Sequence, residues 1–247
     1  MHHLLRVSFS ASLIFIISAL PPVYPQNKSI ENIVSELELI LNKKNEKSLN
    51  KILSKEIIAE LTNKYKDFIH RFPNAQWAIK PLGKIKDNEI ILDIKIKAEQ
   101  EIDNEKFTLE VKQITEIKVN ERKIVSLKLI NESSILKSVD SPLKVTIKSP
   151  NIVLTGVRYD IDIILEDPLG ENFLTGGIMI VDRDKLIRGP TPYIDLLPLG
   201  AGGLFKSIQA PFKPGEQTLA ALLIHPKGII SITKLVKIVS NEQEINI

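Results

Sequence analysis

Two aspartates, Asp160 and Asp162, lie one residue apart in an alternating segment, and Glu166 and Asp167 follow closely. Side chains at positions i and i+2 of a strand point to the same face, and carboxylates bind Ca²⁺ where a loop supplies further oxygen ligands. The spacing differs from that of an EF-hand loop. The alternative is a solvated strand face on which these carboxylates pair with Arg158 or with neighbouring lysines. We expect the solvated face and predict no metal site.

The segment Gly200-Ala201-Gly202-Gly203 is superficially similar to a phosphate-binding loop. Such a loop joins a strand to a helix whose N-terminus contacts the phosphate. The next residues, 204–208 (Leu-Phe-Lys-Ser-Ile), have the composition of a strand instead. We therefore predict a tight turn or bulge at these glycines, and a bend or a close approach of the backbone at Gly176-Gly177.

Few side chains in the chain have a chemistry that supports catalysis. The absence of cysteine excludes disulfides, thiolate catalysis, cysteine-ligated zinc and lipidation of a lipobox cysteine. Beyond residue 26 the only histidines are His70, near the end of a predicted helix, and His225. A surface or capping role is expected for His70 rather than that of a general base, and no G-x-S-x-G motif is present. We predict no catalytic residue and no cofactor.

Composition favours a soluble, folded chain that does not bind nucleic acid. Hydrophobic residues make up 43% of the chain and charged residues 26%, which is usual for a globular protein with a core. The 33 Lys and Arg residues exceed the 30 Asp and Glu residues by three, and the signs are interspersed. Recognition of phosphates would require a basic patch, and none is visible in the sequence.

The first 26 residues have the pattern of a secretory signal. Arg6 precedes an apolar stretch, 7–20, and Pro21 and Pro22 follow it. The stretch is short for a membrane span, which needs about 20 residues. No clean small-x-small cleavage site is present, so an uncleaved N-terminal anchor is the alternative. We predict an exported protein, located in the periplasm, in the thylakoid lumen or anchored to a membrane and facing outward.

Helical periodicity extends up to Pro73 and then changes to strand periodicity. Apolar residues at spacings of three and four predict helices over 29–41, 48–53 and 54–72. Beyond Pro73, alternation predicts four long antiparallel strands, with turns at Asp87-Asn88, Asp103-Asn104 and Asn120-Glu121. The apolar face of these strands must be covered, and the preceding helices are the available cover.

This order of elements, over about residues 29 to 138, resembles the cone-shaped fold of nuclear transport factor 2, the SnoaL-like polyketide cyclases and ketosteroid isomerase. The resemblance implies a pocket between helices and sheet, in which some members place an acid or a base. No motif in this sequence identifies a residue that corresponds to such an acid or base. Trp77, the only tryptophan, lies on the first predicted strand and is a candidate for the floor of a ligand pocket. The alternative is that it is a large core residue.

The composition changes at Asp140-Ser141-Pro142, because most of the prolines and glycines of the chain occur after this point. Seven strands are predicted, over 143–148, 158–166, 177–181, 193–197, 204–210, 219–225 and 229–239. Short strands separated by turns are typical of an immunoglobulin-like sandwich, and the final hairpin resembles that of disulfide-free fibronectin type III and bacterial immunoglobulin-like domains. The whole architecture resembles a family of exported cyanobacterial proteins, which implies no known activity.

An apolar segment, Leu196 to Leu199, lies close in sequence to Phe205 and Phe212. It is expected either at an interface between two domains or as an exposed patch for a partner, and we favour the interface.

The sequence thus predicts an α+β cone of the nuclear transport factor 2 type followed by an all-β immunoglobulin-like sandwich. The expected division is a signal or anchor over 1–26, the cone over 27–139, the sandwich over 142–240 and a tail over 241–247. We predict a non-enzymatic binding protein whose partner is a protein or a small hydrophobic ligand, with membrane contact only through the N-terminal segment. The alternatives are an enzyme of the cyclase or isomerase type using the cone's pocket, and an envelope adhesion module, which would require a large exposed apolar patch.

Overall fold

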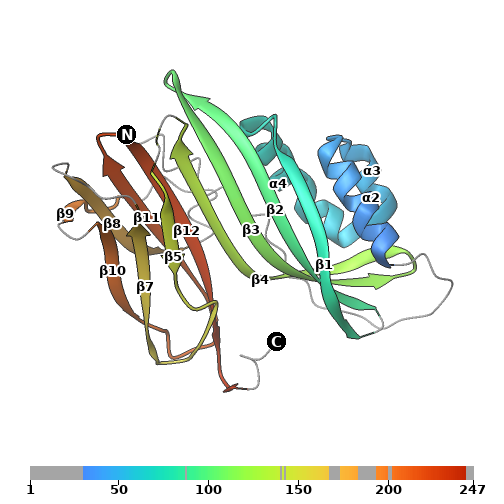
Figure 1. The fold of residues 1–247 in the computed structure, drawn as a ribbon. Helices are drawn as coiled ribbons and strands as arrows, with labels where there is room; N and C mark the ends of the chain where they lie inside the picture. The colour runs from blue at the N-terminus through green and yellow to red at the C-terminus, as the bar shows by residue number, and fades with distance from the viewer. Residues whose placement is uncertain are drawn as a thin grey trace. The chain divides into compact units, whose positions relative to one another are not determined.

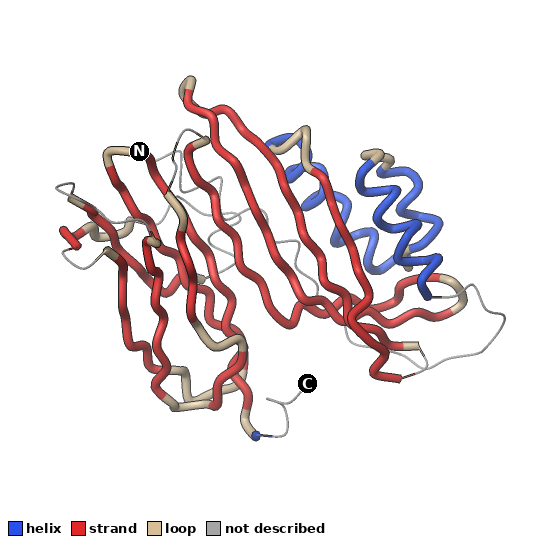
Figure 2. Tube along the Cα trace, viewed as in Figure 1, coloured by secondary structure: helices blue, strands red, loops and turns tan. Residues whose placement is uncertain are grey.

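A computed structural model describes residues 30–86, 88–139, 141, 143–166, 173–182, 193–199 and 202–242. The predicted leader, 1–26, lies outside these residues, as does most of the predicted tail. Within the described chain three helices precede a large antiparallel sheet, so the expected α+β composition is confirmed (Figure 1). Figure 2 shows the three helices beside the long strands that follow them in the chain.

The described residues form two compact units. The N-terminal unit comprises 30–100 and 109–132, and the C-terminal unit comprises 101–108 and 133–242. The boundary between the units therefore falls inside three strands. The change in proline and glycine content, by contrast, lies at residues 140–142. Strands of 14 to 16 residues are long enough to contribute to both units.

In the N-terminal unit the helices are α2 (Ile30–Asn42), α3 (Glu46–Ile52) and α4 (Lys55–Arg71). Their apolar residues recur at helical spacing and are buried, as in α4, where Ile57, Leu61, Tyr65 and Phe68 form one stripe. The helix ends one residue before Phe72, as expected for a residue that precedes proline. Figure 1 shows the helices against one side of the sheet of this unit.

That sheet is a meander of β1 (Gln76–Lys86), β2 (Glu89–Ile102), β3 (Glu105–Asn120) and β4 (Lys123–Ser138). Alternate residues are buried along β2 and β3, which confirms the predicted period. Two connections are tight turns with left-handed residues, Asp103-Asn104 and Glu121-Arg122. The second turn lies one residue beyond the predicted position, because the residues that adopt positive φ are Glu121 and Arg122.

The C-terminal unit contains two sheets, and its strands are β5 (Val145–Lys148), β6 (Ile152–Leu154), β7 (Arg158–Leu165), β8 (Leu174–Val181), β9 (Leu197–Leu199), β10 (Gly203–Gln209), β11 (Gly215–His225) and β12 (Gly228–Val239). One sheet has the order β10-β7-β5. The other contains β4-β12-β11-β8-β9, with β6 parallel to β12. Apolar residues of β7, such as Ile161 and Ile163, share a buried cluster with residues of β11 and β12.

Two strands of the C-terminal unit differ from the prediction. β6 has only three residues, too few to show a period. The strand predicted over 193–197 occurs at Leu197–Leu199 instead, because the preceding residues cross β8 closely without pairing to it. A Cβ at Gly177 would lie 2.0 Å from the Asp195 carbonyl oxygen, so the close backbone approach predicted for this glycine is confirmed.

The β3–β4 turn offers a test of this backbone geometry. Arg122 has a φ of 66°, a left-handed conformation that is costly for a residue with a Cβ but not for glycine. We expect Arg122→Gly to raise the free energy of unfolding by about 0.5–1 kcal/mol. Urea denaturation measures the change, and Lys112→Gly, at an exposed position within β3, should lower stability. Equal effects of the two variants would contradict the assigned turn.

Candidate functional site

The N-terminal unit contains a narrow apolar cavity beside Trp77. The Trp77 ring is buried on β1 and packs against Tyr65, at a centroid distance of 6.0 Å, and against Phe68, at 5.5 Å. The cavity has a volume of about 40 Å³ and is lined by Leu37, Leu41, Leu49, Leu53, Leu61, Tyr65, Trp77, Ile79, Ile94, Ile96, Gln113 and Leu127. Ligand pockets generally measure about 300–1,000 Å³. This cavity is therefore too small for an ordinary ligand.

One carboxylate, Glu132, is buried close to this cavity. Gln113 of β3, which lines the cavity, donates a hydrogen bond from Nε2 to Glu132 Oε2 on β4 at 2.6 Å. Both side chains are only 3% exposed. A buried carboxylate requires such a donor, since its desolvation is otherwise unfavourable. The pair was not predicted, although a glutamine and a glutamate in otherwise apolar alternating strands are the signal that could have indicated it.

Tyr65 lies at the same cavity, but its environment keeps the hydroxyl protonated. Burial, and secondarily the negative charge of Glu46, raise the pKa of Tyr65 to about 12. Its hydroxyl donates to the Leu41 carbonyl oxygen at 3.0 Å. A protonated phenol engaged in this way is a structural group rather than a base at neutral pH.

The two histidines lie in different units. His70 is exposed in the last turn of α4. His225, at the end of β11, is 5% exposed and accepts a hydrogen bond at Nδ1 from the Lys227 amide. Burial, together with the nearby charge of Lys227, lowers the pKa of His225. Its Nε2 has no partner, and no group of three His, Cys, Asp or Glu residues suitable for a metal occurs in the described chain.

The aspartates of β7 lie on its solvated face, as expected. Asp160 is opposite Ser207 and Asp162 is opposite Phe205 in the pairing of β7 with β10. Of the basic residues expected to pair with them, Arg158 donates from Nε to Gln209 Oε1 at 3.4 Å, and Lys148 of β5 lies opposite Asp162 in the register. Among the described residues, neither aspartate makes an ion pair or hydrogen bond.

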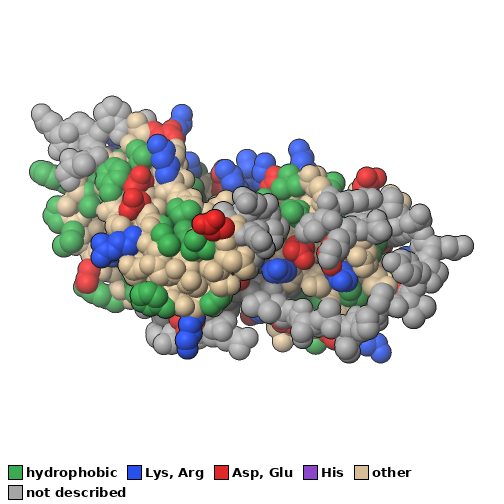
Figure 3. Space-filling model, turned by 90° about the horizontal axis from the view of Figure 1, so that it is seen from below, with side chains coloured by type: hydrophobic (Ala, Val, Ile, Leu, Met, Phe, Trp, Pro, Cys, Tyr) green, Lys and Arg blue, Asp and Glu red, His purple; other side chains and the backbone are tan. Residues whose placement is uncertain are grey.

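The C-terminal unit has an open groove between β8, β9 and β10, which we call the β10 groove. Its volume is about 550 Å³, and it is lined by Gly176, Gly177, Ile178, Met179, Ile180, Tyr193, Asp195, Leu197, Leu199, Leu204, Phe205, Lys206 and Ile208. Apolar side chains are exposed along it: Tyr193 by 76%, Leu197 by 66% and Phe205 by 57%. Figure 3 shows hydrophobic patches among charged side chains on this unit, at the left.

Leu197, Phe205 and Phe212 are exposed within the C-terminal unit taken by itself. The expectation that the segment 196–199 lies at a domain interface remains a prediction. The exposure within the unit has a geometric reason: the glycines of β8 allow the chain near Asp195 to lie flat on that strand. The apolar side chains that follow are then left along the rim of the β10 groove.

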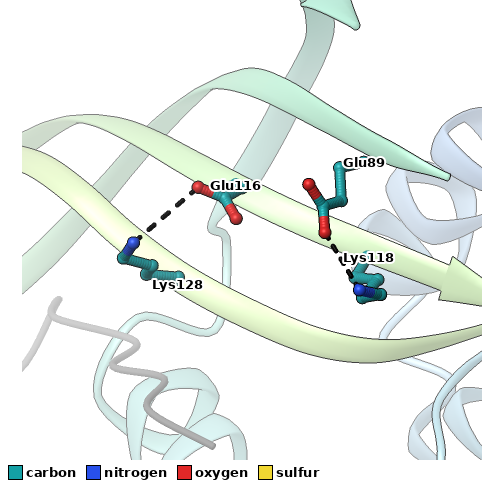
Figure 4. A network of polar contacts seen from close by, with 4 residues as sticks. All are labelled: Glu89, Glu116, Lys118 and Lys128. Carbon is teal, nitrogen blue, oxygen red and sulfur yellow. Dashed lines mark hydrogen bonds and ion pairs between the residues drawn. The ribbon is translucent and has the colours of Figure 1, made fainter. Parts of the chain in front are cut away.

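Charged residues on the N-terminal sheet compensate one another (Figure 4). The Lys118 Nζ lies 3.0 Å from Glu89 Oε1, and the Lys128 Nζ lies 3.9 Å from Glu116 Oε2. Partly exposed pairs of this kind contribute little to stability. Because each cation faces a carboxylate, these four residues do not form a phosphate-binding patch.

Comparison with known families gives one match. Residues 140–239 match the family described as "Domain of unknown function (DUF8623)". This segment contains β5 to β12. A search of curated proteins finds no match. No helix in the described part of the chain is long and apolar enough to cross a membrane.

The Gln113–Glu132 pair is expected to stabilise the fold rather than to serve chemistry. Gln113→Leu removes the donor of the hydrogen bond to Glu132 Oε2, which should lower the free energy of unfolding by about 1.5–3 kcal/mol. Glu132→Gln retains an oxygen that can accept the hydrogen bond from Gln113, so it should lower the free energy of unfolding by less. Urea unfolding of both variants measures the difference, and a larger loss for Glu132→Gln would contradict this assignment.

His225 should make stability depend on pH. Its folded pKa lies below the ordinary value of 6.5, so the unfolded chain takes up the proton first as the pH falls. The stabilisation is complete above the unfolded pKa, decreases as the pH falls through it, and is constant below the folded pKa. Thermal unfolding between about pH 8 and pH 5 measures this slope. His225→Gln should flatten it, while the matched exposed variant His70→Gln should retain it.

Proposed function

We propose that this chain is an exported, non-enzymatic binding protein that contacts a partner protein through its C-terminal unit. The observation that carries the proposal is the contrast between two spaces. The N-terminal cavity measures about 40 Å³, whereas the β10 groove measures about 550 Å³ and is rimmed by exposed apolar side chains. Exposed apolar patches on folded proteins often mark sites of interaction.

We also propose finer folds for the two units. Three helices against one side of a four-stranded meander support the cone of the nuclear transport factor 2 type. Two sheets that share one apolar core, in a chain without cysteine, support a disulfide-free immunoglobulin-like sandwich. Export is proposed on the pattern of residues 1–26 alone.

The chemistry of the described residues favours binding over catalysis. Glu132, the buried carboxylate near the N-terminal cavity, is held by Gln113, and Tyr65 is held in its protonated form. An enzyme of the cyclase or isomerase type would need a larger cavity with a free acid or base. The apolar rim of the β10 groove also satisfies what an adhesion module requires, which differs from our proposal only in the location of the partner.

Affinity capture of the tagged mature protein from its own envelope fraction, followed by mass spectrometry of proteins and small molecules, tests this function. We expect reproducible recovery of a protein. Phe205→Ser, in the β10 groove, should reduce that recovery severalfold, because it removes an exposed aromatic contact.

The matched control is Phe212→Ser, since Phe212 is 84% exposed but does not line the groove. Recovery should be unchanged in this variant. Recovery of a metabolite without any protein would overturn the proposed function.

A further inference from the structure

The strand β10 forms an edge of its sheet. It pairs with β7 on one side, and no other described strand pairs with it. Its seven residues contain no proline. The neighbouring edge strand, β9, has three residues and includes Pro198, which has no amide hydrogen to donate. Natural sheets usually block their edges in such ways, and β10 lacks the block that β9 has.

The hydrogen bonds at both ends of β10 show which of its backbone groups face away from β7. The Leu165 amide donates to the Gly202 oxygen at 2.8 Å, and the Ala210 amide donates to the Val157 oxygen at 2.9 Å. Antiparallel pairs alternate between bonded and non-bonded positions. Even-numbered residues of β10 therefore bond to β7, and the amides and carbonyls of Phe205 and Ser207 point outward, where a further strand would pair.

A strand added at this edge would have two different environments for its side chains. Successive side chains of a strand point to opposite faces. One set would point into the β10 groove, which Leu204 and Ile208 line from this strand. The groove also contains Lys206, whose Nζ donates to the Ile178 carbonyl oxygen at 3.1 Å, and Asp195. Because most of the lining is apolar, apolar side chains are expected in the inward set.

The other set of side chains would lie over the outer face, on which Asp160 is opposite Ser207 and Asp162 is opposite Phe205 of β10 and Lys148 of β5. In the described part of the chain, Asp160 makes no ion pair or hydrogen bond. A serine is short enough to leave the Asp160 carboxylate within reach of a long side chain from the next strand. Lysine or arginine on the outward set would pair with Asp160, whereas glutamate would be repelled.

We propose that the edge of β10 binds an extended segment of a partner protein, in which apolar residues alternate with lysine or arginine, as a fourth strand of the sheet β10-β7-β5. Backbone hydrogen bonds give affinity in this mode of recognition, and the alternating side chains give specificity. The inference rests on the proposed function, because it names the chemistry of the partner.

Binding of synthetic peptides to the full chain tests the inference directly. The probe is a seven-residue peptide of alternating valine and lysine, which matches the length of β10. We expect it to bind, to shift the amide resonances of Phe205 and Ser207, and to bind less tightly at high salt. A peptide of alternating valine and glutamate should not bind. A valine–lysine peptide with proline at the positions that pair with β10 should also fail, and this control leaves the protein unaltered.

Variants of β10 and β7 provide a second test of the proposed binding edge. Ser207→Pro removes an outward amide that does not bond to β7. This variant should bind the valine–lysine peptide about tenfold less tightly, which corresponds to about 1.4 kcal/mol. Its matched control, Ser207→Ala, keeps the amide and should bind as the native chain does. Asp160→Asn should weaken binding and reduce the dependence on salt. Thermal unfolding checks that each variant is folded.

Three results would overturn the inference: equal binding of the proline-containing peptide, equal binding of the glutamate peptide, or self-association of the chain through β10 that Ser207→Pro abolishes. Its failure is separable from that of the proposed function. Capture of a protein that persists with Ser207→Pro would reject the β10 edge while retaining a binding protein. Capture of no protein by the native chain would reject the function itself.

Discussion

The length of β3 and β4 is the constraint on which the structure depends. Each strand has 16 residues, and an apolar face of that length must be covered throughout. The helices provide the cover in the N-terminal unit. The last residues of β4, 133–138, belong to the C-terminal unit, in which β4 is hydrogen bonded to β12. β2, β3 and β4 each contribute residues to both units, so neither unit is formed by one continuous stretch of chain.

The two units differ in the size of the cavity or groove that each contains, and the proposed function rests on that difference. In the N-terminal unit, large side chains such as Trp77 and Phe68 occupy the interior, and the Gln113–Glu132 bond satisfies a buried charge. This arrangement favours rigidity. In the C-terminal unit Gly177 of β8 allows the backbone at Asp195 to approach closely, and apolar groups along the β10 groove remain at the surface. The open groove of the C-terminal unit is the feature on which the proposed binding function rests.

Much of the fold could be predicted because local chemistry determines it. The helical spacing before Pro73, the alternation after it, and the Asp103-Asn104 turn each act over a few residues. The site could not be predicted in the same way. The bond between Gln113 and Glu132 joins residues 19 positions apart, and the edge position of β10 follows from the strand order, which periodicity does not specify. The partner of Arg158 is likewise Gln209, 51 positions further along the chain, rather than a nearby aspartate.

The contribution of β4 to the C-terminal unit has a consequence for dissecting the chain. The segment that matches a family, 140–239, begins after β4 ends. Within the C-terminal unit, β4 contacts β12 through a hydrogen bond between the hydroxyls of Ser134 and Thr233, and the Ile229 amide donates to Ser138 Oγ at 3.0 Å. Excision at residue 140 would remove this neighbour and leave β12 paired with β11 but exposed along the edge that β4 occupies, and exposed strand edges promote aggregation. A soluble fragment would have to start before residue 133.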